Sequence, residues 1–366
     1  MTQIKTAIIG TGGIARAHVR ANQSVGDRTA LVAAMDIDTD RVGAFCETHE
    51  IATPYTDFET LLNNEKPDLV HICTPPGLHA DLSIQAMEAG AWVYCEKPMV
   101  ASLEELDRVQ AVEARTGKHC TSVFQWRFGS GGQHLNHLIQ TNAMGDLLVG
   151  VCNTVWYRGP DYYAVDWRGK WETEVGGTTM IHGIHAIDFF LWHMGDWTEV
   201  RAMIGTLDRD IDVEDVSMAL VKFERGAMGS IVNSALSPRQ ESYLRFDFQK
   251  ATVELSHLYR YVNEDWTYSI RENADETDKQ ALVQWQALPE NQLSSHDAQL
   301  ATLLDDMEHD RQPLTSGNEA RRTVEFLTSM FKSGFTGQPV QRGSITPDDP
   351  FYRALNGGYR IPKERQ

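Results

Sequence analysis

The sequence has few cysteines, and those it has do not form a recognisable redox or metal-binding pattern. The five form an odd set without Cys-x-x-Cys spacing, and most lie in apolar, strand-like contexts: Cys46, Cys73, Cys95, Cys120 and Cys152. An odd set in such contexts does not suggest a disulfide framework. We therefore expect reduced, buried and unreactive thiols, which suits a cytoplasmic protein.

Basic residues are also scarce, and no long apolar run is present. Lysine and arginine total 33 against 51 acidic residues, which gives a formal net charge of -18. Such a charge repels phosphate backbones and anionic membrane surfaces, so we expect no nucleic-acid partner. No apolar run approaches the length of a membrane span, and the N-terminus enters a strand-like run without the features of a secretory signal. We expect a soluble, cytoplasmic protein without a membrane partner.

The first third of the chain alternates short apolar runs with helical patterns. With 366 residues, 42% of them hydrophobic, the chain is long enough for two domains. Apolar runs at 5–10, 29–36, 68–75 and 92–98 are separated by amphipathic segments. Continuous apolar strands between helices are typical of a parallel sheet covered on both faces. We predict a doubly wound, Rossmann-type domain over residues 1–122.

The second part has a different pattern, with longer segments of strand type. These lie at 147–157, 215–224, 228–236 and 243–261, and several alternate apolar and polar residues. Such alternation is typical of an antiparallel sheet with one wetter face. Two helical patterns follow at 296–310 and 317–337. We predict an α+β domain over 123–366 with a large, mostly antiparallel, open-faced sheet, and we allow its C-terminal helices to pack back on the first domain.

A glycine-rich turn follows the first predicted strand. Gly10, Gly12 and Ala15 form a Gly-x-Gly-x-x-Ala pattern at the start of a helix, with Gly13 and Ile14 inside the same turn. Glycines there permit a tight turn and close backbone approach, so that a pyrophosphate sits on the helix N-terminus. The pattern alone is weak evidence, because glycines also serve ordinary turns.

An aspartate strengthens that interpretation. Asp36 ends the second apolar run, 21 residues after Ala15, where a carboxylate accepts hydrogen bonds from the adenosine ribose. It also repels a 2′-phosphate, and residues 37–39 offer no arginine to hold one, so NAD is favoured over NADP. The alternative is a solvated turn aspartate.

The segment 71–80 follows another buried run at the carboxyl edge of the predicted sheet, where ligands bind in open α/β folds. Thr74, Pro75 and His79 are therefore candidates to line the nicotinamide side of the site. A helix-cap or surface role for His79 remains an equal alternative.

Glu96, Lys97 and Pro98 follow the apolar run at 92–95. A lysine directly beyond a buried strand points its amine into the ligand crevice. A desolvated lysine can lose its proton or polarise a carbonyl near neutral pH, as interconversion of alcohol and ketone requires. The alternative is a surface Glu-Lys pair.

Together, the glycine turn, the strand-terminal Asp36 and Glu-Lys-Pro at this spacing resemble the glucose-fructose oxidoreductase / inositol dehydrogenase (Gfo/Idh/MocA) family. The resemblance extends over almost the whole chain. It implies that Lys97 is catalytic, that Glu96 orients it and that Pro98 sets the turn that aims it. It also implies that Gln125 and Arg127, in a Gln-x-Arg pattern, touch cofactor or substrate.

The family's second-domain motif, Gly-Gly-Gly-x-x-x-Asp-x-Gly-x-His, is matched here by Gly176, Gly177, Gly183 and His185. Its usual Asp falls on Ile181, which cannot exchange a proton. His182 stands beside that position, and an imidazole titrates near neutrality, so either histidine can serve as general base. We favour His185 as the base and His182 as a substrate contact.

The same segment allows two further interpretations. His182 and His185 could be two metal ligands, but no adjacent third ligand is evident and hydride transfer to nicotinamide needs no metal, so we expect none. Asp188 either supports His185 or packs the helix, and the resemblance favours a structural role.

Aromatic and charged residues are concentrated just before the Gly-Gly segment, in 158–171. Aromatic faces with polar tips suit a carbohydrate, whose C-H faces stack while its hydroxyls form hydrogen bonds. For any one residue, a buried aromatic loop is a fair alternative. The substrate contacts that we predict are Tyr163, Trp167, Arg168, His182, His185 and Lys97.

These observations predict an NAD-dependent oxidoreductase that transfers a hydride between nicotinamide and a hydroxyl-bearing carbon of a sugar, anhydrosugar or polyol. One alternative is an NAD-dependent glycosidase that oxidises a sugar carbon transiently. Another is a catalytically silent NAD-binding regulator, which the loss of the Asp at Ile181 would suit. By resemblance, we also expect a homodimer or homotetramer formed through the second-domain sheet.

Overall fold

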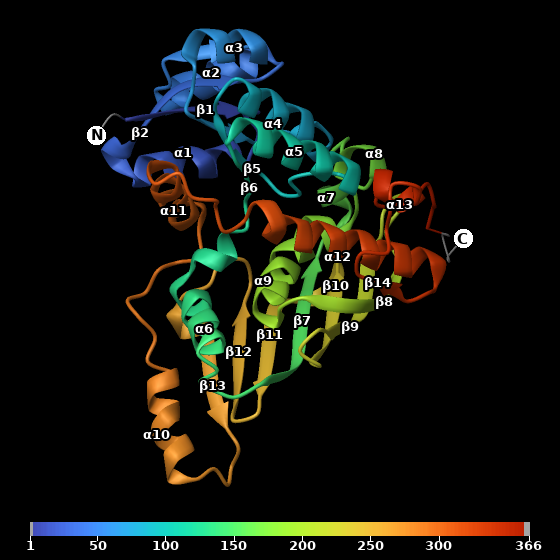
Figure 1. Cartoon of the computed structure of the whole chain (residues 1–366). Coiled ribbons are helices and arrows are strands. Elements are labelled where there is room, and N and C mark those ends of the chain that lie inside the picture. The colour runs from blue at the N-terminus through green and yellow to red at the C-terminus, as the bar shows by residue number, and fades with distance from the viewer. Residues whose placement is uncertain (1–2, 362–366) are drawn as a thin grey trace. The chain divides into compact units, whose positions relative to one another are not determined.

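The computed structural model describes residues 3–361, which divide into two compact units (Figure 1). The first unit contains the residues up to 123 together with 296–321. The second contains 124–295 and the residues from 322 onward. Within 3–361, no helix has both the length and the apolar character that crossing a membrane requires.

The first unit is built on a six-stranded sheet in which every pairing is parallel. The strand order is β3-β2-β1-β4-β5-β6, so the chain moves outward from β1 on one side and returns to continue on the other. This reversal creates a switch point beyond the carboxyl ends of β1 and β4, where ligands bind in such sheets. The strands are β1 (Ile4–Ile9), β2 (Thr29–Met35), β3 (Thr53–Tyr55), β4 (Leu69–Ile72), β5 (Trp92–Cys95) and β6 (Cys120–Ser122).

Helices connect these strands, and their starts follow from local sequence. Asp38 and Ser102 cap the N-termini of α2 and α5, with side chains that accept hydrogen bonds from the backbone N-H groups of Arg41 and Glu105. Helix α11 belongs to this unit although it comes late in the sequence, and its leucines share a core cluster with Trp92. The helices are α1 (Ala15–Ser24), α2 (Thr39–His49), α3 (Phe58–Glu65), α4 (His79–Glu88), α5 (Leu103–Thr116) and α11 (His296–Glu308).

The second unit is built on an eight-stranded sheet with the order β13-β12-β11-β7-β10-β9-β8-β14. Its pairings are antiparallel apart from the central pair β7 and β10, which is parallel. The strands are β7 (Leu147–Tyr157), β8 (Trp197–Gly205), β9 (Val216–Phe223), β10 (Met228–Ser234), β11 (Leu236–Phe248), β12 (Ala251–His257), β13 (Trp266–Ile270) and β14 (Val340–Gln341). The predicted fold class, a Rossmann sheet followed by an α+β domain, is confirmed.

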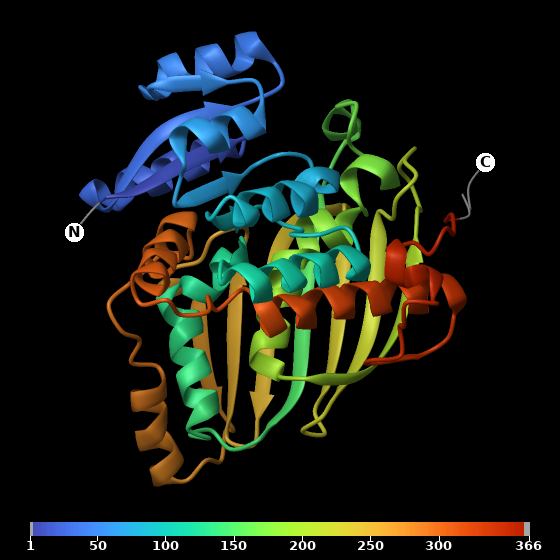
Figure 2. The same cartoon turned by 45° about the horizontal axis from the view of Figure 1, so that its top comes forward.

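Helices cover one face of the second sheet. Figures 1 and 2 show α6 and α9 against the same face, and β9 alternates buried and exposed residues as a sheet covered on one side requires. A π-helical turn, η4 (Thr179–Gly183), leads directly into α9. The helices of the second unit are α6 (Ser130–Gln140), α7 (Pro160–Tyr163), α8 (Trp171–Glu174), α9 (Ile184–Met194), α10 (Glu276–Trp285) and α13 (Pro350–Arg353), with 3-10 turns at Gln125–Phe128 and Asn263–Asp265. Helix α12 (Gly317–Thr336) begins in the first unit and continues from Arg322 in the second.

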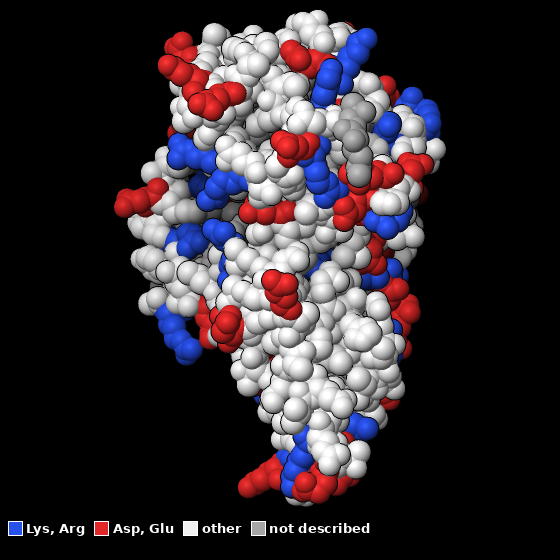
Figure 3. Space-filling model, turned by 90° about the vertical axis from the view of Figure 1, so that its left-hand side faces the viewer, with Lys and Arg blue, Asp and Glu red and all other residues white. Residues whose placement is uncertain are grey.

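On the face that Figure 3 shows, the acidic side chains do not gather in one patch. There, Lys and Arg side chains are interspersed with Asp and Glu, and the second unit presents a broad uncharged area. All five cysteines are free and buried, as predicted. Burial raises the pKa of the Cys152 thiol far above its ordinary value, which keeps the group protonated and unreactive.

Candidate functional site

The glycine turn after β1 has the geometry of a pyrophosphate cradle. Gly10 has a φ of +86°, and a Cβ there would lie 2.8 Å from the carbonyl oxygen of Cys73, so only glycine fits. At Gly12 and Gly13 a Cβ would meet no atom within 4 Å, which leaves open space above the backbone. Ile14 precedes α1, which begins at Ala15. The turn therefore offers free backbone at a helix N-terminus, the arrangement that binds a dinucleotide phosphate.

Asp36 lies at the end of β2 as expected, and its carboxylate is already held by neighbours. It accepts hydrogen bonds from the backbone N and Oγ1 of Thr11, both at 2.9 Å. Arg41 donates to it from Nε at 3.0 Å and Nη2 at 2.5 Å. Burial acts to raise the pKa of Asp36, but these bonds outweigh it and lower the pKa to about 2. Residues 37–39 contain no arginine, but α2 brings Arg41 back to the carboxylate, a contact that the local sequence pattern does not indicate.

The loop after β4 places Thr74 half-buried and Pro75 exposed, next to the glycine turn. His79 is different, because it is buried with Nδ1 2.7 Å from the carbonyl oxygen of Pro98 and Nε2 2.8 Å from that of Thr74. A neutral imidazole has one N-H, so it donates to one of these two carbonyls. His79 therefore ties two loops together, and its place on the nicotinamide side stays a prediction.

Glu96 and Lys97 follow β5 directly, and the Lys97–Pro98 peptide bond is cis. The lysine is half-buried, whereas the Glu96 carboxylate is buried. The backbone N of Lys97 donates to Glu96 Oε2 at 3.3 Å. The carboxylate is thus tied to the backbone that carries the lysine, which fits the orienting role predicted for it.

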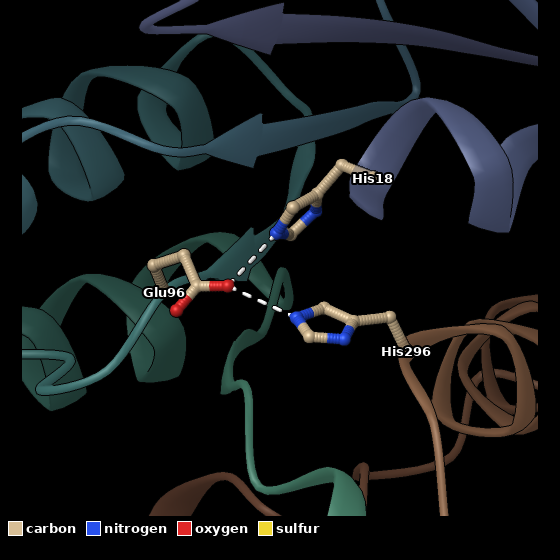
Figure 4. Close-up of side chains that lie close together, drawn as sticks. All are labelled: His18, Glu96 and His296. Carbon is tan, nitrogen blue, oxygen red and sulfur yellow. Dashed lines mark hydrogen bonds and ion pairs between the residues drawn. The ribbon is translucent and has the colours of Figure 1, made fainter. Parts of the chain in front are cut away.

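Two histidines that the sequence argument did not single out hold this carboxylate. Nε2 of His18 and Nε2 of His296 each lie 3.1 Å from Glu96 Oε1 (Figure 4). Burial acts to raise the pKa of Glu96, but these two hydrogen bonds outweigh it and hold the pKa well below its usual range. His18 Nδ1 lies 2.9 Å from Nδ1 of His71, whose Nε2 lies 3.2 Å from the amide nitrogen of Asn22.

These contacts fix one consistent set of tautomers. The Asn22 amide donates to Nε2 of His71, Nδ1 of His71 donates to Nδ1 of His18, and Nε2 of His18 donates to Glu96. Burial lowers the pKa of His18 and His71, which agrees with neutral rings. The result is a buried hydrogen-bonded chain that ends on the carboxylate next to Lys97.

The donor atoms of His18, Glu96 and His296 also lie within 4.8 Å of one another, a set of metal-ligand types. These residues are distinct from the pair His182 and His185, for which we expect no metal. Since both histidine contacts with Glu96 are explained by hydrogen bonds, we assign the cluster to support of Glu96.

In the second unit, the Gly-Gly segment is packed against a buried glutamate. The Glu214 carboxylate accepts hydrogen bonds from the backbone N of Gly177 at 2.9 Å and of Thr179 at 3.0 Å. A Cβ at Gly177 would lie 1.9 Å from the carbonyl oxygen of Glu214, so glycine is required. Burial raises the pKa of Glu214 to about 7 against these bonds. Neighbouring Gly176 has a φ of +142°. The glycines thus fix the start of the histidine-bearing turn.

His185 is buried between two aromatic side chains. Its ring stacks on Trp126 with a centroid distance of 6.0 Å and lies edge-on to Tyr259 at 5.8 Å. Gln125 Nε2 donates to the hydroxyl of Tyr259 at 3.2 Å. The structure therefore brings Gln125 and His185, both selected from the sequence, into one cluster.

Arg127 does not join that cluster. It is fully buried and donates to both carboxylate oxygens of Asp188, from Nε at 2.8 Å and Nη2 at 2.7 Å. Asp188 also accepts from Thr323 Oγ1 at 2.8 Å. A buried charge must be paired, and this one is paired inside the protein. Arg127 is therefore held in a buried ion pair with Asp188, and its contact with cofactor or substrate stays a prediction.

His182 faces a second aromatic group, in which Trp156 lies edge-on to Tyr259 at 6.2 Å. The His182 ring lies 5.1 Å from that of Trp156 and 5.6 Å from that of Tyr162. Arg158 Nε donates to His182 Nε2 at 3.1 Å, which places the imidazole proton on Nδ1, 3.5 Å from the hydroxyl of Thr178. Ile181, at the family's aspartate position, lies within the same π-helical turn.

The remaining predicted substrate contacts surround Tyr162. Tyr163 packs edge-on against it at 5.0 Å, and the Arg168 guanidinium lies 3.9 Å from its ring and 4.4 Å from the ring of Trp167. Arg168 also pairs with the buried Glu174. Burial raises the pKa of Tyr162 to about 12, so its hydroxyl stays protonated and can donate hydrogen bonds. Tyr163, Trp167 and Arg168 are all partly exposed.

Comparison with known families agrees with this geometry. Residues 4–124 match the model described as an oxidoreductase family with an NAD-binding Rossmann fold. Residues 133–254 match the GFO/IDH/MocA C-terminal domain. The two matches cover the glycine turn, Lys97, both histidines and most of the second sheet.

Individual relatives extend the likeness over nearly the full chain. D-apiose dehydrogenase of Paraburkholderia graminis is 24% identical over 97% of this chain and 94% of its own length. D-glucoside 3-dehydrogenase of Escherichia coli is 26% identical over 75% of this chain and 84% of its own. The WlbA dehydrogenase of Bordetella pertussis, solved with NADH and UDP-GlcNAcA, superposes with a TM-score of 0.82 at 26% identity, covering 93% of this chain and 98% of that one. This chain is therefore an NAD-dependent oxidoreductase that belongs to the GFO/IDH/MocA family.

Proposed function

We propose that the chain is a dehydrogenase that oxidises one hydroxyl-bearing carbon of a sugar, anhydrosugar or polyol with NAD. Its relatives include dehydrogenases named for D-apiose and D-glucosides. The observation that carries the proposal is the aromatic surround of two neighbouring histidines, with Trp126 and Tyr259 about His185 and Trp156 and Tyr162 about His182. Such rings stack on sugar C-H faces.

The two units divide the work in this proposal. The first holds NAD through its glycine turn, the strand-terminal aspartate and the loop after β4, with the cofactor contacts Gly10, Gly12, Gly13, Ile14, Ala15, Asp36, Thr74 and Pro75. The second binds substrate through the histidine-bearing turn and the segment 158–171. Bound nicotinamide supplies the hydride acceptor at its C4 position.

The residues of the chain handle the proton. His185 acts as the general base that takes the proton of the substrate hydroxyl, while its ring is held by stacking on Trp126. Lys97 places positive charge beside the alkoxide that develops. Glu96 keeps its charge because His18 and His296 donate to it, and it therefore provides a fixed negative group beside the lysine backbone.

The proposal is tested by incubating the purified protein with NAD or NADP and a panel of sugars, anhydrosugars and polyols, while following the absorbance of reduced nicotinamide. We expect NAD reduction with one structural group of substrates. NAD binding without reduction on any member would reject the dehydrogenase. Release of an aglycone from a panel of glycosides, without net formation of NADH, would then identify a glycosidase. If no reaction of either kind occurred, the protein would be identified as an NAD-binding regulator.

We also propose that the chain forms a homodimer or homotetramer through the open face of its second sheet. Met203 and Met218 are cross-strand neighbours there, as are Val149 and Met228, and they are 46–76% exposed, as is Leu220 on the same face. Exposed apolar side chains gathered on one sheet face are suited to burial against a second copy of the chain. Light scattering should give a multiple of 41.2 kDa, and Met218→Glu should lower it.

A cytoplasmic location is the setting we propose. The free, buried cysteines fit a reducing compartment. Fractionation of cells that express the tagged protein tests it, and recovery outside the cytosol would reject it.

A further inference from the structure

The guanidinium of Arg158 is surrounded by neutral partners. Nε donates to Nε2 of His182 at 3.1 Å, and Nη1 donates to the carbonyl oxygen of Tyr157 at 2.7 Å and to Oε1 of Gln240 at 3.2 Å. The group also lies 4.9 Å from the ring of Trp156. Within residues 3–361, no carboxylate lies within ion-pair distance of it.

The neighbouring arginines differ in this respect. Arg168 pairs with Glu174, Arg209 with Asp208 and Arg127 with Asp188. Arg158 is partly buried, as Arg168 and Arg209 are, in a protein that carries 51 acidic residues. A partly buried cation retains a strong attraction for an anion, because water screens it incompletely.

The position of Arg158 identifies the anion. It bonds to a histidine that lies three residues before His185, the proposed base, and it is packed against Trp156 and Tyr162, whose rings lie 4.9 and 5.4 Å from its guanidinium carbon. A ligand that reaches His185 and these rings therefore passes close to the guanidinium. We propose that the substrate is a sugar acid, an aldonate or uronate, whose carboxylate is bound by Arg158.

A single planar guanidinium favours a carboxylate over a phosphate. Its fork of N-H donors matches a planar monoanion, whereas a dianionic phosphate commonly recruits several cations or a helix N-terminus. Two other arginines lie close by: Arg168 also contacts the ring of Tyr162, and Arg209 donates from Nε to the carbonyl oxygen of Arg158. Both are already paired with carboxylates, those of Glu174 and Asp208. The aromatic rings beside Arg158 would stack on the ring or chain carbons of the same sugar acid.

This inference rests on the proposed dehydrogenase function and is tested with matched pairs of neutral and acidic substrates. The pairs are D-glucose with D-glucuronate, D-galactose with D-galacturonate, and D-glucitol with D-gluconate. We expect kcat/KM to be at least tenfold higher for an acidic member than for its neutral partner. In Arg158→Met the acid-to-neutral ratio should fall by about 10- to 100-fold, as loss of a charged hydrogen bond implies. The exposed Arg239→Met is the control and should keep the wild-type ratio.

The outcomes separate the two proposals. Turnover of neutral sugars in preference to acids, or an equal loss on both in Arg158→Met, would overturn the sugar-acid inference and leave the dehydrogenase intact. Turnover of no compound would reject the dehydrogenase. In that case, calorimetric titration of D-glucuronate and D-gluconate into the NAD-loaded protein decides the inference: binding that Arg158→Met abolishes supports it, and no binding overturns it.

Discussion

The guanidinium of Arg41 forms two hydrogen bonds with the carboxylate of Asp36, at the end of the strand that leads to the adenosine site. Arg41 remains about half exposed, so it would be available to another anion if the carboxylate were removed. We predict that Asp36→Ser weakens NAD binding about tenfold, because ribose hydrogen bonds are lost, and strengthens NADP binding. Fluorescence titration of both cofactors measures the two dissociation constants.

The double variant Asp36→Ser/Arg41→Met is the control for that prediction. Without the guanidinium, the gain in NADP affinity should disappear while NAD affinity stays low. If the double variant bound NADP as tightly as the single variant Asp36→Ser does, Arg41 would not hold the 2′-phosphate.

Substitution of Lys97 or His185 should lower kcat without a comparable loss of NAD affinity. We predict that Lys97→Met lowers kcat by about 10³-fold, since charge stabilisation at the alkoxide is lost, with the NAD dissociation constant changed by less than about threefold. His185→Gln should lower kcat by about 10²- to 10⁴-fold, the range of general base catalysis. Steady-state kinetics on the best substrate of the panel measures both.

His182→Gln is the matched comparison, because His182 lies three residues before His185, in the turn that leads into α9. We expect it to raise KM more than it lowers kcat, as a substrate contact does. A greater loss of kcat in His182→Gln than in His185→Gln would reverse the assignment of the base.

The buried histidines should make the first unit sensitive to acid. Burial holds the pKa of His18 and His71 below the ordinary value of 6.5, so below about pH 6.5 the unfolded chain binds protons that the folded chain does not. The free energy of unfolding should therefore fall as the pH drops below about 6.5, by about 1.4 kcal/mol per pH unit for each such proton. Glu96, whose pKa is lowered, adds a further loss below about 4.5.

His71→Gln tests this cause. Its Tm should decline less steeply than that of the wild type between pH 7.5 and pH 5, measured by thermal unfolding. His309→Gln, at an exposed position, should leave the slope unchanged. Equal slopes in His71→Gln and the wild type would exclude the buried chain as the origin of the acid sensitivity.

Substitution of two glycines by alanine should change the stability of the protein in opposite directions. Gly177→Ala places a Cβ 1.9 Å from the backbone oxygen of Glu214, so we predict a loss of about 2–4 kcal/mol in stability and a loss of activity. In Gly43→Ala, on α2, the Cβ meets nothing within 4 Å, so stability should rise by about 0.5–1 kcal/mol. Chemical unfolding curves measure both, and a stable Gly177→Ala would contradict the packing described.

The features of the fold and of the candidate site that depend on short sequence patterns could be predicted from the sequence. The alternation of strands and helices, the glycine turn and Asp36 are all features of short segments, and each lies where the pattern predicts. The Arg41 contact was missed because it depends on the pitch of α2, which returns a side chain five residues further on to the carboxylate.

Contacts between side chains that lie far apart in the sequence could not be predicted from local patterns. Arg127 pairs with Asp188, which comes 61 residues later, and nothing local to either residue signals the pair. The same holds for His296, which reaches Glu96 across 200 residues, and for Arg158, whose significance depends on which acidic groups fail to reach it. Only tertiary packing decides which charges are neutralised.

The division of the first unit into two stretches has a consequence for biosynthesis. The ribosome makes all six strands of the first sheet early, but α11, whose leucines share a core cluster with Trp92 and whose His296 donates to Glu96, emerges only after the whole of 124–295. A nascent chain that ends before residue 296 therefore has an uncovered apolar patch and a carboxylate with one imidazole donor instead of two. Synthesis of the nucleotide-binding unit therefore begins first but is completed only when α11 emerges. We expect the nascent chain to need a chaperone most between the synthesis of β6 and that of α11.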